Sequence, residues 1–189
     1  MFKLIDFSVG AYDAKNEKVR KLVLNTVICP SDGESWSSGP DAVASSYAGM
    51  DHDVEAAIDH DNHGVFVLNM SVSIDSLTDG TSSTLFVGEK ALTKSELGWI
   101  SGTRATLRNG GSRINHNLQG LRVQFPIDSQ NPPPTPPGPE HVGGFSSHHS
   151  GGAHFAIGDG SVRFVNENIS EAVFRRLTNR SDGDPIGDF

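Results

Sequence analysis

Apolar residues along the chain recur with two different spacings, which predict two helices and several short strands. In residues 16–25 and 170–179 the apolar positions follow the period of an amphipathic helix. Other apolar runs are short and bounded by glycine, aspartate or asparagine, as is typical of buried strands. The expected strands are 64–68, 84–89, 153–157 and 161–165, with a further short candidate at 45–49.

The most specific local prediction is a β-hairpin in the last quarter of the chain. The runs 153–157 and 161–165 are separated by Asp159-Gly160, a favoured dipeptide of two-residue hairpin turns. Beyond the second run, Ser170 has the residue type and position of a helix N-cap. We therefore expect strand, turn, strand and helix in this order.

The stretch 101–140 shows no regular pattern, and only its end supports a prediction. Residues 131–140 are rich in proline, which neither pairs inside a sheet nor continues a helix. We expect an extended spacer there, with a docking site for a proline-reading partner as the alternative.

Composition narrows the class of protein. The chain has 189 residues, a formal net charge of −8 and one cysteine. At this length we expect a single domain over 1–189, with enough buried surface to fold without a disulfide or a metal. The acidic balance argues against binding to nucleic acid or to anionic membranes, because both attract basic surfaces. No apolar run reaches the roughly 18 residues of a membrane-spanning helix.

Four motifs, in order along the chain, carry a resemblance to a known family. The most specific is His149, followed by nine residues and then Asp159-Gly160. The other three are the stretches 27–32 (ending Cys-Pro-Ser-Asp), 45–49 and 78–89, and the ending 169–189 fits as well. Together they closely resemble the bacterial pilin-like, prepilin-type family of unknown function that carries the processing-associated H-X(9)-D-G region, here 143–189.

The resemblance implies a fold and a cellular setting. It implies an α+β, pseudopilin-like domain with long loops, in which a helix packs on one face of an antiparallel sheet. It implies a non-catalytic structural or assembly subunit of the cell envelope, or of a type II secretion or pilus system. The partners would be other pilin-like or envelope proteins.

The front of the chain departs from the family, whose members begin with a prepilin leader and a long apolar helix. We expect the chain to be a truncation or a natural fragment, which is soluble by itself. The full-length form is expected to be exported to the periplasm or cell surface and anchored in the membrane through the absent helix.

Catalysis has little support in the sequence. No serine lies in a nucleophile-elbow context, and Cys29 precedes a proline, so a hydrolase is the least favoured alternative. By resemblance, a second family cysteine lies in the absent region, which leaves a disulfide to Cys29 open. The motif residues expected to have structural roles are Cys29, Asp32, Asp79, Gly80, Glu89 and Gly160.

The main alternative to an assembly role is a module that binds calcium, zinc or a small ligand. His149 and Asp159 are one candidate metal pair, although zinc needs at least three protein ligands. The other interpretation of this pair is a hydrogen bond that locks the hairpin, because aspartate in such turns accepts from nearby backbone N–H groups.

A second metal candidate is the run 51–63, which is dense in aspartate and histidine. Its carboxylates suit calcium and its imidazoles suit zinc, but the order of residues is not that of an EF-hand. A solvated acidic loop is the other interpretation. The candidate ligands are Asp51, Asp53, His60 and His63, of which the two histidines would share one face of a helix.

The four Asp-Gly pairs of the chain are best interpreted as turns. Some secretion pseudopilins hold calcium in a loop near the C-terminus, and this resemblance makes Asp182, Asp184 and Asp188 a further calcium candidate.

Overall fold

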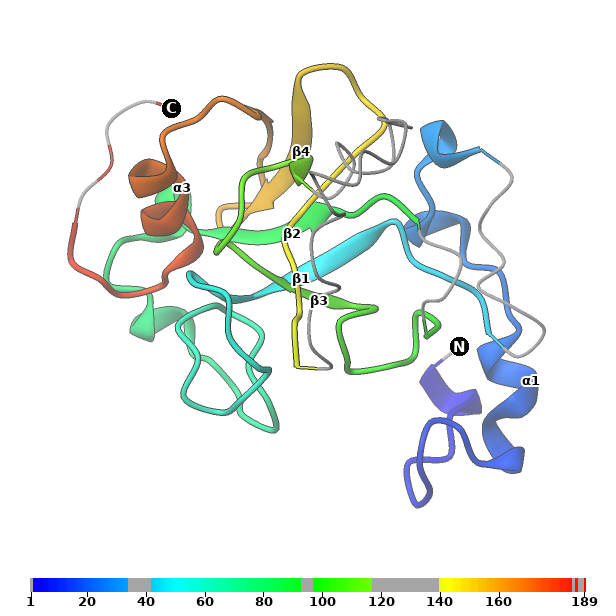
Figure 1. The fold of residues 1–189 in the computed structure, drawn as a ribbon. Coiled ribbons are helices and arrows are strands. Elements are labelled where there is room, and N and C mark those ends of the chain that lie inside the picture. Colours follow the sequence, from blue (N-terminus) through cyan, green and yellow to red (C-terminus); the bar gives the residue numbers. More distant parts are fainter. Residues whose placement is uncertain (1, 34–41, 93–96, 117–139, 185, 187–188) are drawn as a thin grey trace, which may run out of the picture.

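A five-stranded sheet with the order β3-β1-β2-β4-β5 forms the centre of the computed structural model (Figure 1). The structure describes residues 2–33, 42–92, 97–116, 140–184, 186 and 189. The strands are β1 (Tyr47–His52), β2 (Leu85–Glu89), β3 (Leu107–Asn109), β4 (Gly152–Ile157) and β5 (Val162–Asn166). The described α-helices are α1 (Glu17–Arg20) and α3 (Glu171–Thr178). Short 3-10 turns lie at Phe2–Leu4, Ala14–Asn16, Asn25–Val27, Pro30–Asp32, Ile74–Ser76 and Thr81–Ser83.

The α+β class is confirmed, but the sheet is mixed rather than antiparallel. β1 pairs with β2, β2 with β4 and β4 with β5 in antiparallel fashion, whereas β1 and β3 run parallel. Parallel neighbours need a crossover connection. Here the connection from β1 to β3 is long and includes β2. It therefore allows β3 to pair at the edge of the sheet, parallel to β1.

The two faces of the sheet differ in what covers them. On one face, Met50, Phe155 and Val165 pack with Phe174 and Leu177 of α3, and all five side chains are buried. The opposite face carries residues that alternate with these along the same strands, because successive side chains of a strand point to opposite sides. They are Tyr47, Val87, Glu89, His154, Ala156, Val162 and Phe164.

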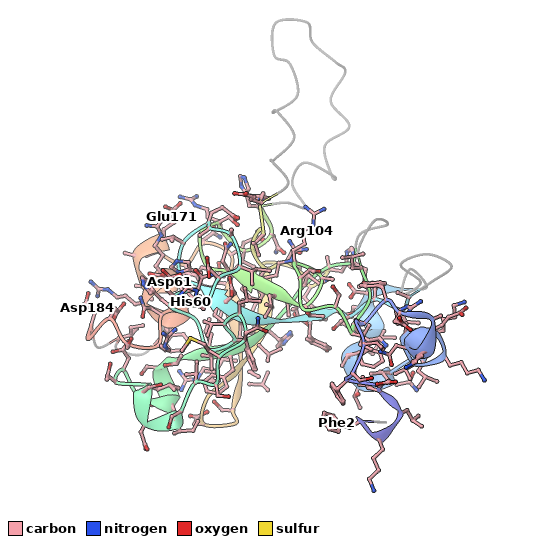
Figure 2. The ribbon with its side chains drawn as sticks, turned by 90° about the horizontal axis from the view of Figure 1, so that it is seen from below. Phe2, His60, Asp61, Arg104, Glu171 and Asp184 are labelled. Atoms are coloured by element: carbon pink, nitrogen blue, oxygen red, sulfur yellow. The ribbon has the colours of Figure 1, made fainter. Side chains whose placement is uncertain are left out.

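The expected N-terminal helix over 16–25 is much shorter than predicted. α1 has four residues, of which Val19 and Arg20 are buried, and it ends at Arg20, with Lys21 as its C-cap. Leu22 and Val23 remain exposed, so the apolar side chains of the second half of the predicted helix do not pack against the core. A short helix without such packing is marginal in water, which explains why it ends early. α1 and α3 lie at opposite ends of the molecule (Figures 1 and 2).

The expected strand at 64–68 is wrong. The N–H groups of Val65 and Phe66 both donate to the carbonyl of Met50, at 2.9 Å each. A regular ladder spreads its bonds over successive residues, so a shared acceptor marks a segment that crosses β1 instead of extending the sheet. Gly64 permits this crossing, because an added Cβ would lie 2.4 Å from the Met50 carbonyl oxygen.

The other element predictions are confirmed. Residues 84–89, 153–157 and 161–165 lie in or within one residue of β2, β4 and β5, and the candidate at 45–49 overlaps β1. The turn between β4 and β5 is longer than the predicted two-residue turn. Ile157 N donates to the Ser161 carbonyl at 2.9 Å, so three residues, 158–160, close the hairpin, and of Asp159 and Gly160 only Gly160 has a positive φ, of 86°.

The C-terminal helix is also confirmed as α3, with Ser170 at the N-cap position. The Ser170 side chain makes no capping hydrogen bond there.

Part of the remaining sequence predictions falls outside the described residues. Residues 117–139, which include most of the proline-rich segment, belong to this part, whereas β3 lies in the stretch that supported no prediction. No helix within the described ranges is long and apolar enough to cross a bilayer.

Candidate functional site

Three ionisable side chains meet on the sheet face opposite α3, although they come from distant parts of the chain. Cys29 directly precedes the 3-10 turn Pro30–Asp32, Glu89 ends β2, and His149 lies in the turn before β4. Backbone hydrogen bonds bring these segments together. Ser46 N donates to the Val27 carbonyl at 2.8 Å, and Ser146 N donates to the Glu89 carbonyl at 3.0 Å.

The donor and acceptor atoms of this Cys29–Glu89–His149 cluster converge on one point. The Cys29 Sγ atom lies 3.6 Å from His149 Nε2 and 3.7 Å from Glu89 Oε1. His149 Nε2 and Glu89 Oε1 are 3.1 Å apart. Cys29 and Glu89 are 7% and 4% exposed, so two of the three groups are almost withdrawn from solvent.

The second oxygen of Glu89 is held by His154 of β4. The backbone N–H of His154 donates to Glu89 Oε2 at 2.7 Å, and His154 Nδ1 lies 3.2 Å from the same oxygen. The His149 backbone is also fixed, because its N–H donates to Ser147 Oγ at 2.9 Å. These bonds orient the carboxylate so that Oε1 faces the thiol and the imidazole.

A pocket of about 480 Å³ opens at the cluster. Its lining includes Cys29, Glu89 and His149 together with Tyr47, Val87, His154, Ala156 and Val162. Burial, followed by the nearby Cys29 and Glu89, raises the pKa of the Tyr47 phenol. Asp32, behind the cysteine, lies 3.5 Å from His148 Nε2, and burial raises the pKa of its carboxyl group.

The shared nitrogen of His149 limits the chemistry of the cluster. In a nucleophile–base–carboxylate relay, the histidine contacts the nucleophile through one ring nitrogen and the carboxylate through the other. Here Nε2 faces both the thiol and Glu89. The geometry therefore disfavours a thiol hydrolase and fits three groups directed at a common ligand.

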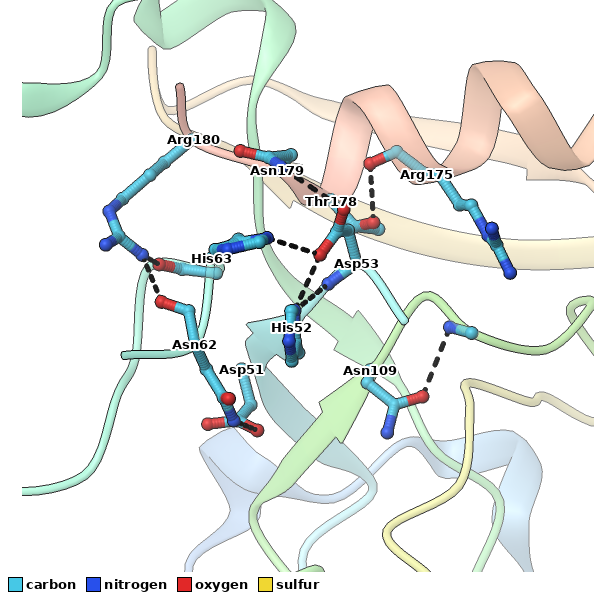
Figure 3. Close-up of polar contacts among 12 residues, drawn as sticks. Asp51, His52, Asp53, Asn62, His63, Asn109, Arg175, Thr178, Asn179 and Arg180 are labelled. Atoms are coloured by element: carbon cyan, nitrogen blue, oxygen red, sulfur yellow. Dashed lines mark hydrogen bonds and ion pairs between the residues drawn. The ribbon is translucent and has the colours of Figure 1, made fainter. Parts of the chain in front are cut away.

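A second polar cluster lies between the end of β1 and the end of α3 (Figure 3). Asp53 Oδ1 lies 2.6 Å from His52 Nδ1 and 3.0 Å from His63 Nδ1. Asn179 Nδ2 donates to Asp53 Oδ2 at 3.2 Å. Burial opposes ionisation of Asp53, but the bonds from Asn179 and His63 outweigh it and lower the pKa of this carboxyl group.

Of the metal candidates in the run 51–63, the structure brings together only Asp53 and His63. Asp51 points instead to Asn62, whose Nδ2 donates to its carboxylate at 2.8 Å. His60 is exposed beside Asp59, with 2.5 Å between Nδ1 and Oδ1. The run is not helical, so the expected common helix face of the two histidines is wrong.

The predicted pair of His149 and Asp159 has separate partners. His149 faces Glu89, whereas Asp159 is exposed in the hairpin turn and accepts from Ser161 N at 2.8 Å. The bond at Asp159 is therefore local to the turn, and His149 takes no recorded part in it.

The Asp-Gly motifs behave as turns. Their glycines, Gly33, Gly80, Gly160 and Gly183, all have positive φ values. Asp79 accepts from Asp182 N and Gly183 N at 2.9 and 2.8 Å. The Asp182 carboxylate accepts from Asp184 N at 2.8 Å, and Asp184 pairs with Arg176 at 3.0 Å, so both described calcium candidates face protein donors. Asp188 lies outside the described residues.

Sequence reasoning named Cys29, Glu89 and His149 separately and missed that they meet. It also missed His154 and Tyr47. The signal available in the sequence was the position of Cys29 before a predicted turn and of Glu89 at the end of a predicted strand, where side chains can converge. Neither spacing nor periodicity pointed to His154, because its role depends on the neighbouring strand β2.

Comparison with known proteins places the chain in a family without giving it a function. No curated protein sequence and no solved structure matches it. A family model described as "Protein of unknown function (DUF1559)" matches residues 1–172, which is most of the chain. The protein therefore belongs to the DUF1559 family.

Proposed function

We propose that this domain is a non-catalytic, pilin-like assembly subunit of the cell envelope, which acts by contact with other envelope subunits. Membership in a family of unknown function is compatible with this role but does not supply it. The sequence motifs that resemble the prepilin-type family support it, as does a sheet with a helix packed on one face.

The observation that carries the proposal is apolar exposure on the sheet face opposite α3. Val162 and Phe164 of the edge strand β5 are 65% and 45% exposed, although they belong to the most regular hairpin of the structure. Clustered exposed apolar side chains mark interaction surfaces, and an unpaired edge strand offers backbone groups beside them. A neighbouring pilin-like subunit is the occupant we propose for this surface.

Site-specific photo-crosslinking in cells that make the full-length protein tests the role. A photoreactive residue at position 164 is expected to give crosslinks to envelope proteins, and the protein is expected in the envelope fraction. The matched control is position 175, where an exposed arginine lies on α3, behind the opposite face. We expect no such crosslinks from position 175.

Two outcomes would contradict the proposal. One is a purely cytoplasmic full-length protein that forms no crosslinks. The other is equal crosslinking from positions 164 and 175, because unspecific capture would not depend on the exposed apolar face.

A further inference from the structure

We infer that Cys29, Glu89 and His149 form a zinc-binding site, with the thiolate, the carboxylate and the imidazole as its three protein ligands. The inference does not depend on the assembly role, because it uses only the convergence of these side chains on the sheet face opposite α3. It shares His149 with one metal pair suggested by sequence, but it replaces Asp159 with Cys29 and Glu89 and uses no residue of the run 51–63 or of the C-terminal aspartates.

The distances within the cluster match the edges of a zinc tetrahedron. With bonds of about 2.3 Å to sulfur and about 2.0 Å to nitrogen and oxygen, tetrahedral angles place sulfur about 3.5 Å from both nitrogen and oxygen, and nitrogen about 3.3 Å from oxygen. The corresponding distances are 3.6 Å, 3.7 Å and 3.1 Å. The three atoms can therefore bind one ion without rearrangement of the backbone.

The types of ligand favour zinc over calcium or magnesium. Sulfur and imidazole nitrogen are ligands of zinc and other transition metals, whereas calcium and magnesium take oxygen ligands. One thiolate, one imidazole and one carboxylate also supply the three protein ligands that a zinc site with an open position needs.

Surrounding hydrogen bonds hold the ligands in place. His154 binds the carboxylate oxygen that does not face the cluster, through its backbone N–H and its Nδ1. Such contacts orient metal ligands, and their loss typically weakens metal affinity about 10–100-fold. The site is thus supported by β4 as well as by the three segments that carry its ligands.

The pocket determines which molecules could reach the fourth coordination position of a bound ion. All three ligands line the cavity of about 480 Å³, so a bound ion is accessible to a water molecule or a small anionic ligand from that side. Tyr47 lines the same pocket and places a hydroxyl group within this lining. Zinc sites with three protein ligands generally keep such an open position.

The experiment uses the full 189-residue chain, reduced, treated with a chelator and dialysed. Zinc is titrated in competition with a chromophoric chelator, and cobalt(II) is titrated separately as a spectroscopic substitute. We expect one zinc per chain. Cobalt is expected to give a thiolate-to-metal charge-transfer absorption in the near ultraviolet and the visible bands of a four-coordinate ion.

Matched variants locate the ion. Cys29→Ser and His149→Ala are expected to weaken zinc binding by at least about 100-fold, since they remove ligands rather than supporting contacts. His63→Ala removes a histidine from the second polar cluster and is expected to leave zinc binding unchanged. Circular dichroism establishes that each variant is folded.

Three outcomes would overturn the inference. One is the absence of stoichiometric zinc binding to the wild-type chain. Another is cobalt binding without a thiolate charge-transfer band, a result that needs no variant and so does not depend on variant folding. The third is loss of binding in His63→Ala with retention in folded Cys29→Ser, which would move the ion to the second polar cluster.

Discussion

The Cys29–Glu89–His149 cluster and the second polar cluster around Asp53 use similar side chains in different settings. In the second cluster both oxygens of Asp53 have partners within the protein, namely two imidazoles and the amide of Asn179. In the first, both oxygens of Glu89 also have partners, but one of these is a thiol, and the cluster lines a pocket. A thiol is a ligand that zinc favours, and the pocket gives an ion access to it, so we assign metal binding to the first cluster and a structural role to the second.

The comparison also shows that local abundance of aspartate and histidine is a poor guide to a site. The run 51–63 is the densest in these residues, yet it spreads them among β1, hydrogen bonds to neighbouring loops and an exposed pair at Asp59 and His60. The cluster with pocket access takes one residue from each of three distant segments.

The largest expected effect separates the two clusters by their response to metal. Zinc at 100 times its dissociation constant is expected to raise the free energy of unfolding by about 2.7 kcal/mol, because it binds the folded state. Denaturant unfolding with and without zinc measures this gain. His149→Ala should lose it and His63→Ala should keep it; a gain retained in folded His149→Ala would break the proposed contrast.

The next effect concerns Asp51, which is fully buried in β1 beside the second cluster. Burial raises the pKa of its carboxyl group to about 6, from the ordinary 3.8. Because the folded state holds this proton more tightly than the unfolded state, stability is greatest below about pH 4 and falls as the pH rises through about 6.

Asp51→Asn removes the charge and keeps an oxygen that can accept from Asn62 Nδ2. At pH 7 the variant is expected to be more stable than wild type by about 2 kcal/mol. The rise of the pKa from 3.8 to about 6 corresponds to about 3 kcal/mol, at about 1.4 kcal/mol per pKa unit. The buried NH2 group that the substitution introduces offsets about 1 kcal/mol of this gain. The free energy of unfolding, measured with urea from pH 4 to 7, should fall with pH in the wild type, and in the variant it should lose the part of this slope that Asp51 causes. An unchanged slope would show that this carboxyl group titrates normally.

The smallest effect tests whether the second cluster is structural. Asp53→Ala is expected to lower the free energy of unfolding by about 1–2 kcal/mol, because it leaves the amide of Asn179 and the imidazole of His63 without their acceptor. The loss should be the same with zinc and with a chelator. A destabilisation that appears only when zinc is present would assign the metal to this cluster instead.

Short-range interactions made a large part of the fold predictable from sequence. Asp159-Gly160 specifies a tight turn, and the alternating residues on either side specify the strands that it joins, so the β4–β5 hairpin follows from adjacent residues. The spacing of Phe174 and Leu177 likewise predicts α3 and its buried face. The family motifs identified Cys29, Glu89 and His149 as residues of interest for the same reason, since each motif is local.

Only the tertiary structure determined which of those elements pack against one another. The parallel pairing of β3 with β1, the crossing of β1 by residues 64–66 and the early end of α1 depend on which surfaces are available for packing. The cluster depends on contacts between Cys29 and residues 60 and 120 positions away. Periodicity reports the conformation of neighbouring residues, whereas such contacts form only when the sheet is assembled. The sequence by itself therefore determined the hairpin, the C-terminal helix and the turn glycines, and the folded sheet determined the site.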